Sequence, residues 1–287
     1  MSSAGSVIRK ACAVLAVLGL AAALTGCGVE RTVDPVADAA TKSVKAGGAK
    51  ITFDATIQAG AKSYTLSGDG AFDQDAGQMT LDLSQALAAA GAPAGTDGKT
   101  TELFLHENGD EVVYVDAPFL SSRLPGGATW VKLDLMKAGT SIGGNLGQLT
   151  APATQNPAQL LDVLRQIGQV DVVGTETIDG VSTTHYHGTI DLAKAAAKAG
   201  RGAQAALGAL IAQGAPGEVP VDVWIGDDGL VRQFKLSYGM TAGGTPLSLA
   251  LTFGIGDYGT DVSVTPPPAD QVFDVTAFAQ LAASAYH

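Results

Sequence analysis

The stretch KITFDATIQA, residues 50–59, alternates apolar and polar side chains along its length. Ile51, Phe53, Ala55 and Ile57 form one set, and threonine, aspartate and glutamine lie between them. A period of two residues is typical of a β-strand with one buried face and one face in water. The stretch therefore predicts a sheet that is covered on one side only, as antiparallel sheets commonly are.

The same period continues through most of the chain. The predicted strands lie in the segments 50–59, 63–72, 77–84, 101–117, 129–135, 169–178, 182–191, 220–240 and 246–259. Tight hairpin turns are expected at three residue pairs that lie within or between these segments. They are Asn108–Gly109, Asp179–Gly180 and Asp228–Gly229. We expect about 10–11 strands, mainly antiparallel, because such short turns cannot connect parallel neighbours. The triplet PPP at 266–268 is expected to block further pairing.

Helical patterns interrupt the strands. Residues 34–48 predict a helix that Asp34 caps and that ends at Gly47–Gly48, and residues 157–167 and 192–214 predict two more. A short helix is expected over 275–285. The glycine-rich segment 136–156 has no periodicity and is interpreted as a loop that could act as a gate. The fold class is therefore α+β, with a curved sheet covered on its concave face by a few helices.

The first 26 residues have the anatomy of a secretory signal. Arg9 and Lys10 precede the apolar run ACAVLAVLGLAAAL (11–24), which is shorter than the about 20 residues that a membrane span needs. The run ends in LTGC (24–27), which resembles the lipobox of bacterial lipoproteins. That resemblance implies a diacylglyceryl group on the sulfur of Cys27 and cleavage before this residue. The alternative is a free thiol at the end of a membrane-anchor helix.

A lipobox has consequences for location and organisation. It implies attachment to the outer face of the cytoplasmic membrane, with residues 27–49 forming the lipidated cysteine, a tether and a helix. Residues 50–287 are interpreted as a single domain. Of the two cysteines, Cys12 would be lost with the signal, so we expect no disulfide and no cysteine metal site.

The charge of the chain excludes one class of partner. The net charge is −11, and loss of Arg9 and Lys10 with the signal would make it −13. Nucleic-acid binding needs a basic face, so no nucleic acid is expected. We expect a monomer.

One tripeptide has the residues of a metal site. His185 and His187 in HYH lie two residues apart on a predicted strand and so share a face. No further ligand occurs at a defined spacing, and the ordinary interpretation is an exposed polar strand face with Tyr186 pointing inward. We expect no metal and no cofactor.

No other motif predicts catalysis. The acidic segments DQD (73–75) and GDD (226–228) lie in turns, where aspartate bonds locally, and no EF-hand spacing is present. No G-x-S-x-G elbow occurs, so no catalytic residue is proposed and a hydrolase is disfavoured. Trp130 and Trp224 lie opposite the apolar stripes of their strands, where they either pack on the outer face or stack on a sugar.

The order of elements resembles the LppX/LprG family of actinobacterial lipoproteins and, more distantly, the LolA-type lipoprotein carrier fold. The phrases DAATKSVKAGGAKITFDATI (38–57), VVGTETIDGVSTTHYHGTIDLAKA (172–195) and VPVDVWIGDDGLVRQFKLSY (219–238) support this resemblance. It implies an incomplete β-barrel over helices, with a hydrophobic cavity for acyl chains. It also implies a protein that binds or transfers lipids or lipoglycans and is not an enzyme.

Strand and helix phase give the side chains expected to line that cavity. They are Phe53, Leu66, Leu105, Val113, Val115, Leu161, Leu164, Tyr186, Phe234, Leu236, Leu249 and Leu251. Most apolar stripes are ordinary core, so a second hypothesis remains open. It is a cell-surface interaction or sensor lipoprotein without a cavity or a lipid ligand.

Overall fold

A computed structural model of the chain describes residues 34–275 except 90, 108, 135–160, 162, 199–203, 205–207, 209–210, 212–213 and 243–244. Cys27, the segment 136–156 and nearly all of the helix expected at 275–285 lie outside the described residues. The chain divides into two compact units, Met1–Val33 and Asp34–His287. Every element described below belongs to the second unit.

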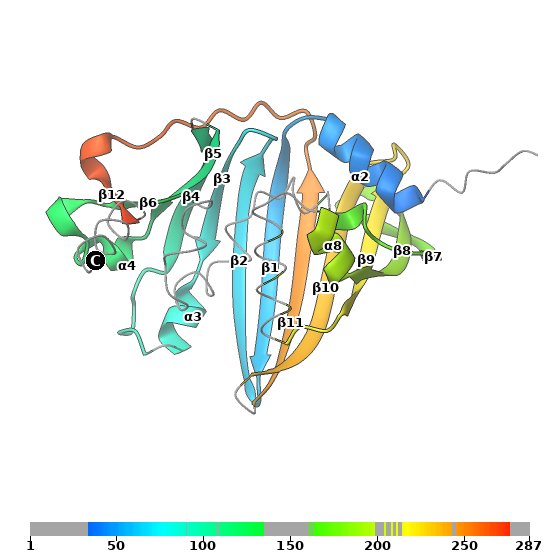
Figure 1. Cartoon of the computed structure of the whole chain (residues 1–287), viewed down its shortest axis with the longest axis horizontal. Helices are drawn as coiled ribbons and strands as arrows, with labels where there is room; N and C mark the ends of the chain where they lie inside the picture. The colour runs from blue at the N-terminus through cyan, green and yellow to red at the C-terminus, as the bar shows by residue number, and fades with distance from the viewer. Residues whose placement is uncertain are drawn as a thin grey trace, which may run out of the picture. The chain divides into compact units, whose positions relative to one another are not determined.

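One sheet of twelve strands dominates the described part of the chain (Figure 1). Its spatial order is β12-β6-β5-β4-β3-β2-β1-β11-β10-β9-β8-β7. The strands are β1 (Ala49–Ala59), β2 (Lys62–Phe72), β3 (Ala76–Asp82), β4 (Lys99–Glu107), β5 (Asp110–Asp116), β6 (Trp130–Asp134), β7 (Asp171–Ile178), β8 (Val181–Asp191), β9 (Glu218–Gly226), β10 (Val231–Ala242), β11 (Thr245–Gly256) and β12 (Val272–Asp274).

The predicted α+β class with a mainly antiparallel sheet is confirmed. The first strand, β1, lies at the centre of the sheet, paired with β2 on one side and β11 on the other. Each remaining neighbour pair is antiparallel except β12 with β6, which is parallel. The prediction that PPP ends all pairing was wrong, because the chain re-enters the sheet at Val272 as β12. Among the described residues β12 and β7 are the two edges, so the barrel is incomplete.

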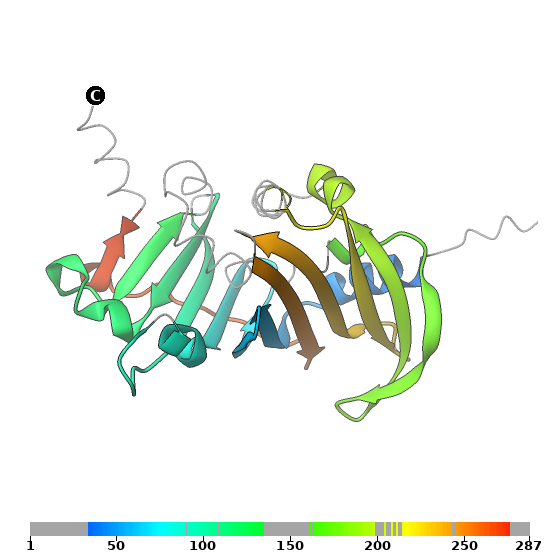
Figure 2. The ribbon, with the colours of Figure 1, turned by 90° about the horizontal axis from the view of Figure 1, so that it is seen from below.

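Local irregularities bend the sheet, as Figure 2 shows for β10, β9, β8 and β7. The register shifts between Val231 and Gln233 and again between Val172 and Gly174, and such bulges increase strand twist. At Gly70 in β2, an added Cβ would collide with the carbonyl oxygen of Gln78 in β3. Glycine is thus required there by the close approach of two backbones.

Few helices accompany the sheet. Helix α2 (Pro35–Lys45) begins as predicted, with the carboxylate of Asp34 accepting hydrogen bonds from the backbone N–H groups of Val36 and Ala37. It packs against β9 and β10 (Figure 1). The backbone N–H of Val231 in β10 donates to the Ser43 hydroxyl at 2.9 Å, which joins the helix to the sheet.

The other described helices are short. They are α3 (Ser84–Ala89), α4 (Pro118–Ser121), α8 (Leu192–Lys198) and the 3-10 turns η1 (Pro125–Gly127) and η2 (Ala269–Gln271). Residues 161, 163 and 164 are helical, in agreement with the helix expected over 157–167, and Ile167 forms a bridge with Ile190 of β8. Helices α3 and α4 were not predicted.

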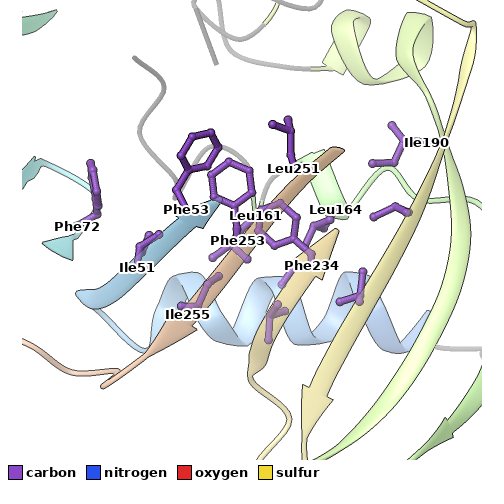
Figure 3. Close-up of a cluster of buried hydrophobic side chains, with 14 of the residues drawn as sticks. Ile51, Phe53, Phe72, Leu161, Leu164, Ile190, Phe234, Leu251, Phe253 and Ile255 are labelled. Atoms are coloured by element: carbon purple, nitrogen blue, oxygen red, sulfur yellow. The ribbon is translucent and has the colours of Figure 1, made fainter. Parts of the chain in front are cut away.

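Three phenylalanines form the centre of the core. Phe53 of β1 and Phe253 of β11 have ring centroids 4.9 Å apart, and Phe234 of β10 stacks on Phe253 at 4.8 Å. Figure 3 shows these rings projecting from neighbouring strands into one cluster with Leu161 and Leu164. Apolar burial of this kind is the main stabilising contribution to the fold.

Candidate functional site

The face of the sheet that carries Phe53 is called the inner face. Strand register identifies its members, because residues directly opposite one another lie on the same face. One row crosses six strands and consists of Phe234, Phe253, Phe53, Gly68, Leu81 and Thr100. Side chains of α2, of α8 and of Leu161, Val163 and Leu164 pack against this face.

Burial decreases along the inner face, away from α2. Phe53, Phe234 and Phe253 are at most 3 % exposed. Two rows further along the same strands, the opposed residues Tyr238, Leu249, Ile57 and Tyr64 are only partly covered, and Ile57 is 40 % exposed. The apolar surface thus extends roughly 13 Å beyond the packed core, at about 3.3 Å per residue.

We call this partly covered region of the inner face the apolar strip. It consists of Ile57, Tyr64, Leu66, Leu236, Tyr238 and Leu249. Burial raises the pKa of the Tyr238 hydroxyl, so this group stays neutral. Charged side chains point to the other face, because Asp54 and Lys235 alternate with the apolar residues of β1 and β10.

The structure divides the predicted cavity residues into two groups. The buried group consists of Phe53, Val113, Leu161, Leu164, Phe234 and Leu251. The partly covered inner-face group consists of Leu66, Val115, Tyr186, Leu236 and Leu249. The phase assigned to Leu105 was wrong. Leu105 lies on the opposite face of β4, where it packs against the cluster of Leu103, Val112 and Tyr114.

Neither of two hollows found over described residues is the predicted acyl cavity. One, of about 30 Å³, lies between α2 and the ends of β1 and β11, and Leu161 is the single predicted cavity residue in its wall. That volume suits about one water molecule. The other, of about 290 Å³, has mixed polar and apolar walls from β2, β3 and residues 261–264. The acyl cavity itself stays a prediction.

The HYH segment lies in β8 with the orientation predicted for it. Tyr186 packs against the core, and both histidines are on the outer face. Nδ1 of His185 is 3.0 Å from a carboxylate oxygen of Glu176, and its Nε2 is 2.9 Å from Oδ1 of Asp222. Nδ1 of His187 is 2.9 Å from the same oxygen. Carboxylates only accept hydrogen bonds, so the two contacts of His185 form together when its ring carries both protons.

These contacts link the two histidines and the two carboxylates, and Trp224 joins them. The indole N–H of Trp224 donates to Glu176 at 3.1 Å, and the ring stacks on His185 at 4.2 Å. Burial acts to raise the pKa of the Asp222 carboxyl, but the hydrogen bonds from His187 and His185 outweigh it, and the pKa is lowered. Trp224 is 4 % exposed, which leaves no open ring face for a sugar. It packs on the outer face.

The remaining motifs have local roles. A carboxylate oxygen of Asp73 accepts hydrogen bonds from the N–H groups of Asp75 and Ala76, and Asp228 accepts one from Leu230, as expected of turns. Within the described ranges, no group of three or more acidic, histidine or cysteine side chains is arranged to hold a metal ion. No helix in the part of the chain that is described has both the length and the apolarity of a membrane span.

Sequence reasoning missed two inner-face residues, Thr100 and Glu102 of β4. Each is 2 % exposed, and neither the Thr100 hydroxyl nor Oε2 of Glu102 has a hydrogen-bond partner among the described residues. The sequence offers no clear signal for them, because Leu103, Phe104 and Leu105 are all apolar and leave the phase of β4 ambiguous.

Comparison with known proteins gives one sequence relative and several structural neighbours. No family model matches the chain. An uncharacterized 31.2 kDa protein of Streptomyces griseus, from the rplA–rplJ intergenic region, is 29% identical over 186 residues. The match covers 63% of this chain and 58% of that protein, so the chain spans less than two thirds of its relative's length.

Solved structures with a similar arrangement include two mycobacterial proteins, LprF and the lipoprotein LppX. LprF from Mycobacterium bovis has a TM-score of 0.39 and 14% identity, covering 82% of this chain and 96% of LprF. LppX from Mycobacterium tuberculosis has a TM-score of 0.39 and 18% identity, covering 81% of this chain and 100% of LppX. A putative outer-membrane lipoprotein-sorting domain from Vibrio parahaemolyticus has a TM-score of 0.31 and 11% identity, covering 78% of this chain and 92% of that domain.

Proposed function

We propose that this chain is a lipid-anchored protein of the cell envelope that binds acyl chains of a lipid or lipoglycan on its inner face. The observation that supports this most directly is the apolar strip, which continues the inner face beyond the packed core. Water-exposed apolar surface is unfavourable by about 25 cal/mol per Å², so a ligand that covers the strip gains this free energy. The proposed role is binding, without an enzymatic step.

The anchor follows from the sequence around Cys27. A lipobox at LTGC (24–27) would place a diacylglyceryl group on the cysteine sulfur. Two acyl chains give stable attachment, at about 0.8 kcal/mol for each methylene buried in the membrane. The protein would then act as a monomer at the outer face of the cytoplasmic membrane.

Cys27→Ser is expected to abolish the anchor. The serine hydroxyl cannot form the thioether, so the protein should leave the membrane fraction and lose the mass of the diacylglyceryl group. Cys12→Ser is the matched control, because Cys12 lies inside the signal and should leave both properties unchanged. Fractionation with intact-mass measurement checks this, and a membrane-bound Cys27→Ser protein would contradict the lipobox.

Lipid binding can be tested on the mature chain, residues 27–287, with Cys27→Ser so that no detergent is needed. Native mass spectrometry should find co-purified lipid, or uptake of offered lipid. Leu236→Asp places a charge in the apolar strip and should reduce the lipid-bound fraction at least about tenfold, since a charge in an apolar site is strongly unfavourable. Ser237→Asp is the control, because Ser237 is exposed on the other face of β10.

A second candidate function is an interaction protein without a lipid ligand. The inner face near α2 is filled by Phe53, Phe234 and Phe253, whose rings contact one another, and the hollow beside α2 measures only about 30 Å³. Val172 and Val173 are exposed on the edge strand β7, where a partner strand could add. Repeatedly empty protein that takes up no offered lipid would favour this candidate and overturn the first.

A further inference from the structure

Two buried polar side chains on β4 lack partners within the described part of the protein. Thr100 and Glu102 lie two residues apart and therefore on the same face of the strand, about 7 Å from each other. Register places both on the inner face, opposite Leu81 and Met79 of β3. The Thr100 hydroxyl and Oε2 of Glu102 are enclosed, yet neither makes a hydrogen bond.

Other buried hydroxyl groups among the described residues are paired. The Ser43 hydroxyl accepts from Val231 N–H at 2.9 Å, and the Thr183 hydroxyl donates to the carbonyl of Glu176 at 2.8 Å. An enclosed polar group without a partner costs about 1–3 kcal/mol. Thr100 and Glu102 therefore destabilise the ligand-free fold. No hydrogen bond among the described residues offsets the cost of burying these two polar groups.

The surroundings of Glu102 define what it can bind. Its cross-strand neighbours are Met79 and Val115, both apolar. Burial raises the pKa of its carboxyl to about 8, so the group is neutral at physiological pH. A neutral carboxylic acid both donates and accepts hydrogen bonds, and so does a threonine hydroxyl. Such a pair is suited to uncharged polar groups, namely ester carbonyls and hydroxyls.

We propose that Thr100 and Glu102 bind the ester and hydroxyl groups of an acylated glycerol or sugar whose chains cover the apolar strip. This rests on the proposed function, because the strip and the polar pair lie on one face of one sheet. Strand β4 is two strands from β2, roughly 10 Å across the sheet, and the row of Glu102 meets β2 at Gly70, which is about 13 Å along the strand from Leu66. An ester group at Glu102 thus lies within an acyl chain's length of Leu66.

Two probes distinguish the contribution of Thr100 and Glu102 to binding from the contribution of the apolar strip. Diphenylhexatriene has no hydrogen-bonding group, whereas dioleoylglycerol has two esters and a hydroxyl. With the mature Cys27→Ser chain, Glu102→Met should raise the Kd for dioleoylglycerol about tenfold, which corresponds to roughly one hydrogen bond. The Kd for diphenylhexatriene should not change. Thr100→Val should raise the dioleoylglycerol Kd about threefold, and the exposed control Asp54→Asn should change neither.

Glu102→Gln controls for a folding artefact, because it keeps the volume and hydrogen-bonding capacity of the side chain. It should retain dioleoylglycerol affinity within about threefold. Unchanged dioleoylglycerol affinity in Glu102→Met, or equal losses for both probes, would overturn the inference and leave the proposed function intact. A wild-type protein that binds diphenylhexatriene but not dioleoylglycerol would do the same. Binding of neither probe overturns both proposals.

Discussion

Phe253→Ala is expected to lower the free energy of unfolding by about 3–5 kcal/mol, the usual range for a buried phenylalanine truncated to alanine. Phe253 is 3 % exposed and lies between Phe53 and Phe234, with ring centroids 4.9 and 4.8 Å away. Its loss removes both ring contacts and leaves a void that rigid neighbouring strands cannot close. Denaturant unfolding followed by circular dichroism measures the change.

The size of this effect distinguishes a packed core from a cavity wall. Phe253→Leu keeps much of the volume and should cost less, about 1–2 kcal/mol. Ser248→Ala on the outer face of the same strand is the control and should stay within about 0.5 kcal/mol of the wild type. A loss below about 1 kcal/mol for Phe253→Ala would show that its ring borders empty or ligand-filled space.

The buried face of the central strands can be predicted from the sequence because their other face is exposed to solvent. In β1, Phe53 alternates with Asp54 and Thr52, so the period alone assigns the buried side. The same period correctly places Tyr186 inward and both neighbouring histidines outward. This assignment holds whatever covers the sheet, since it depends only on the contrast between the two faces.

Strand phase is ambiguous in β4, and the reason is physical. Leu103, Phe104 and Leu105 form a continuous apolar run because the strand is buried on both faces. Phe104 belongs to the main core, whereas Leu103 and Leu105 belong to the second cluster with Val112 and Tyr114. Alternation of apolar and polar residues cannot identify the inner face of a strand when both of its faces are apolar.

Contacts between distant segments were also beyond prediction from the sequence. The His185 group requires Glu176 and Asp222, which come from β7 and β9 on either side of β8. Strand β12 pairs with β6, far away in the chain, after a proline triplet that indicated the end of the sheet. Register within hairpins is local, but these pairings depend on the complete strand order.

Glu102 should give the folded protein a stability that falls as pH rises through neutrality. Its pKa is raised to about 8 from the ordinary 4.5, with burial as the cause. Between these values the unfolded chain loses the proton and the folded chain keeps it. The folded state then binds more protons, so the free energy of unfolding decreases by about 1.4 kcal/mol per pH unit at most.

Glu102→Gln is neutral in both states and should remove this contribution. The variant and the wild type should unfold with similar free energies at about pH 3.5, which lies below both the ordinary pKa of 4.5 and the raised pKa of about 8, so that the wild-type carboxyl is largely protonated in both states. By pH 7 the variant should be more stable, by an amount on the order of 3 kcal/mol. Denaturant titrations at about pH 5, 6, 7 and 8 measure the difference, and Thr101→Ser, neutral throughout, should keep a constant offset from the wild type.

The pH dependence of the difference in unfolding free energy between the wild type and Glu102→Gln distinguishes a neutral from an ionised Glu102 carboxyl. An ionised Glu102 held by a cationic partner would have a lowered pKa, and the wild type would then gain stability over the variant as pH rises through the acidic range. A neutral, unpartnered Glu102 gives the opposite slope, at higher pH. Bound ester or hydroxyl groups would also favour the neutral form of Glu102, because their oxygens accept a hydrogen bond from its protonated carboxyl. Dioleoylglycerol should therefore bind more weakly as pH rises above about 8, and this loss should be absent in Glu102→Gln.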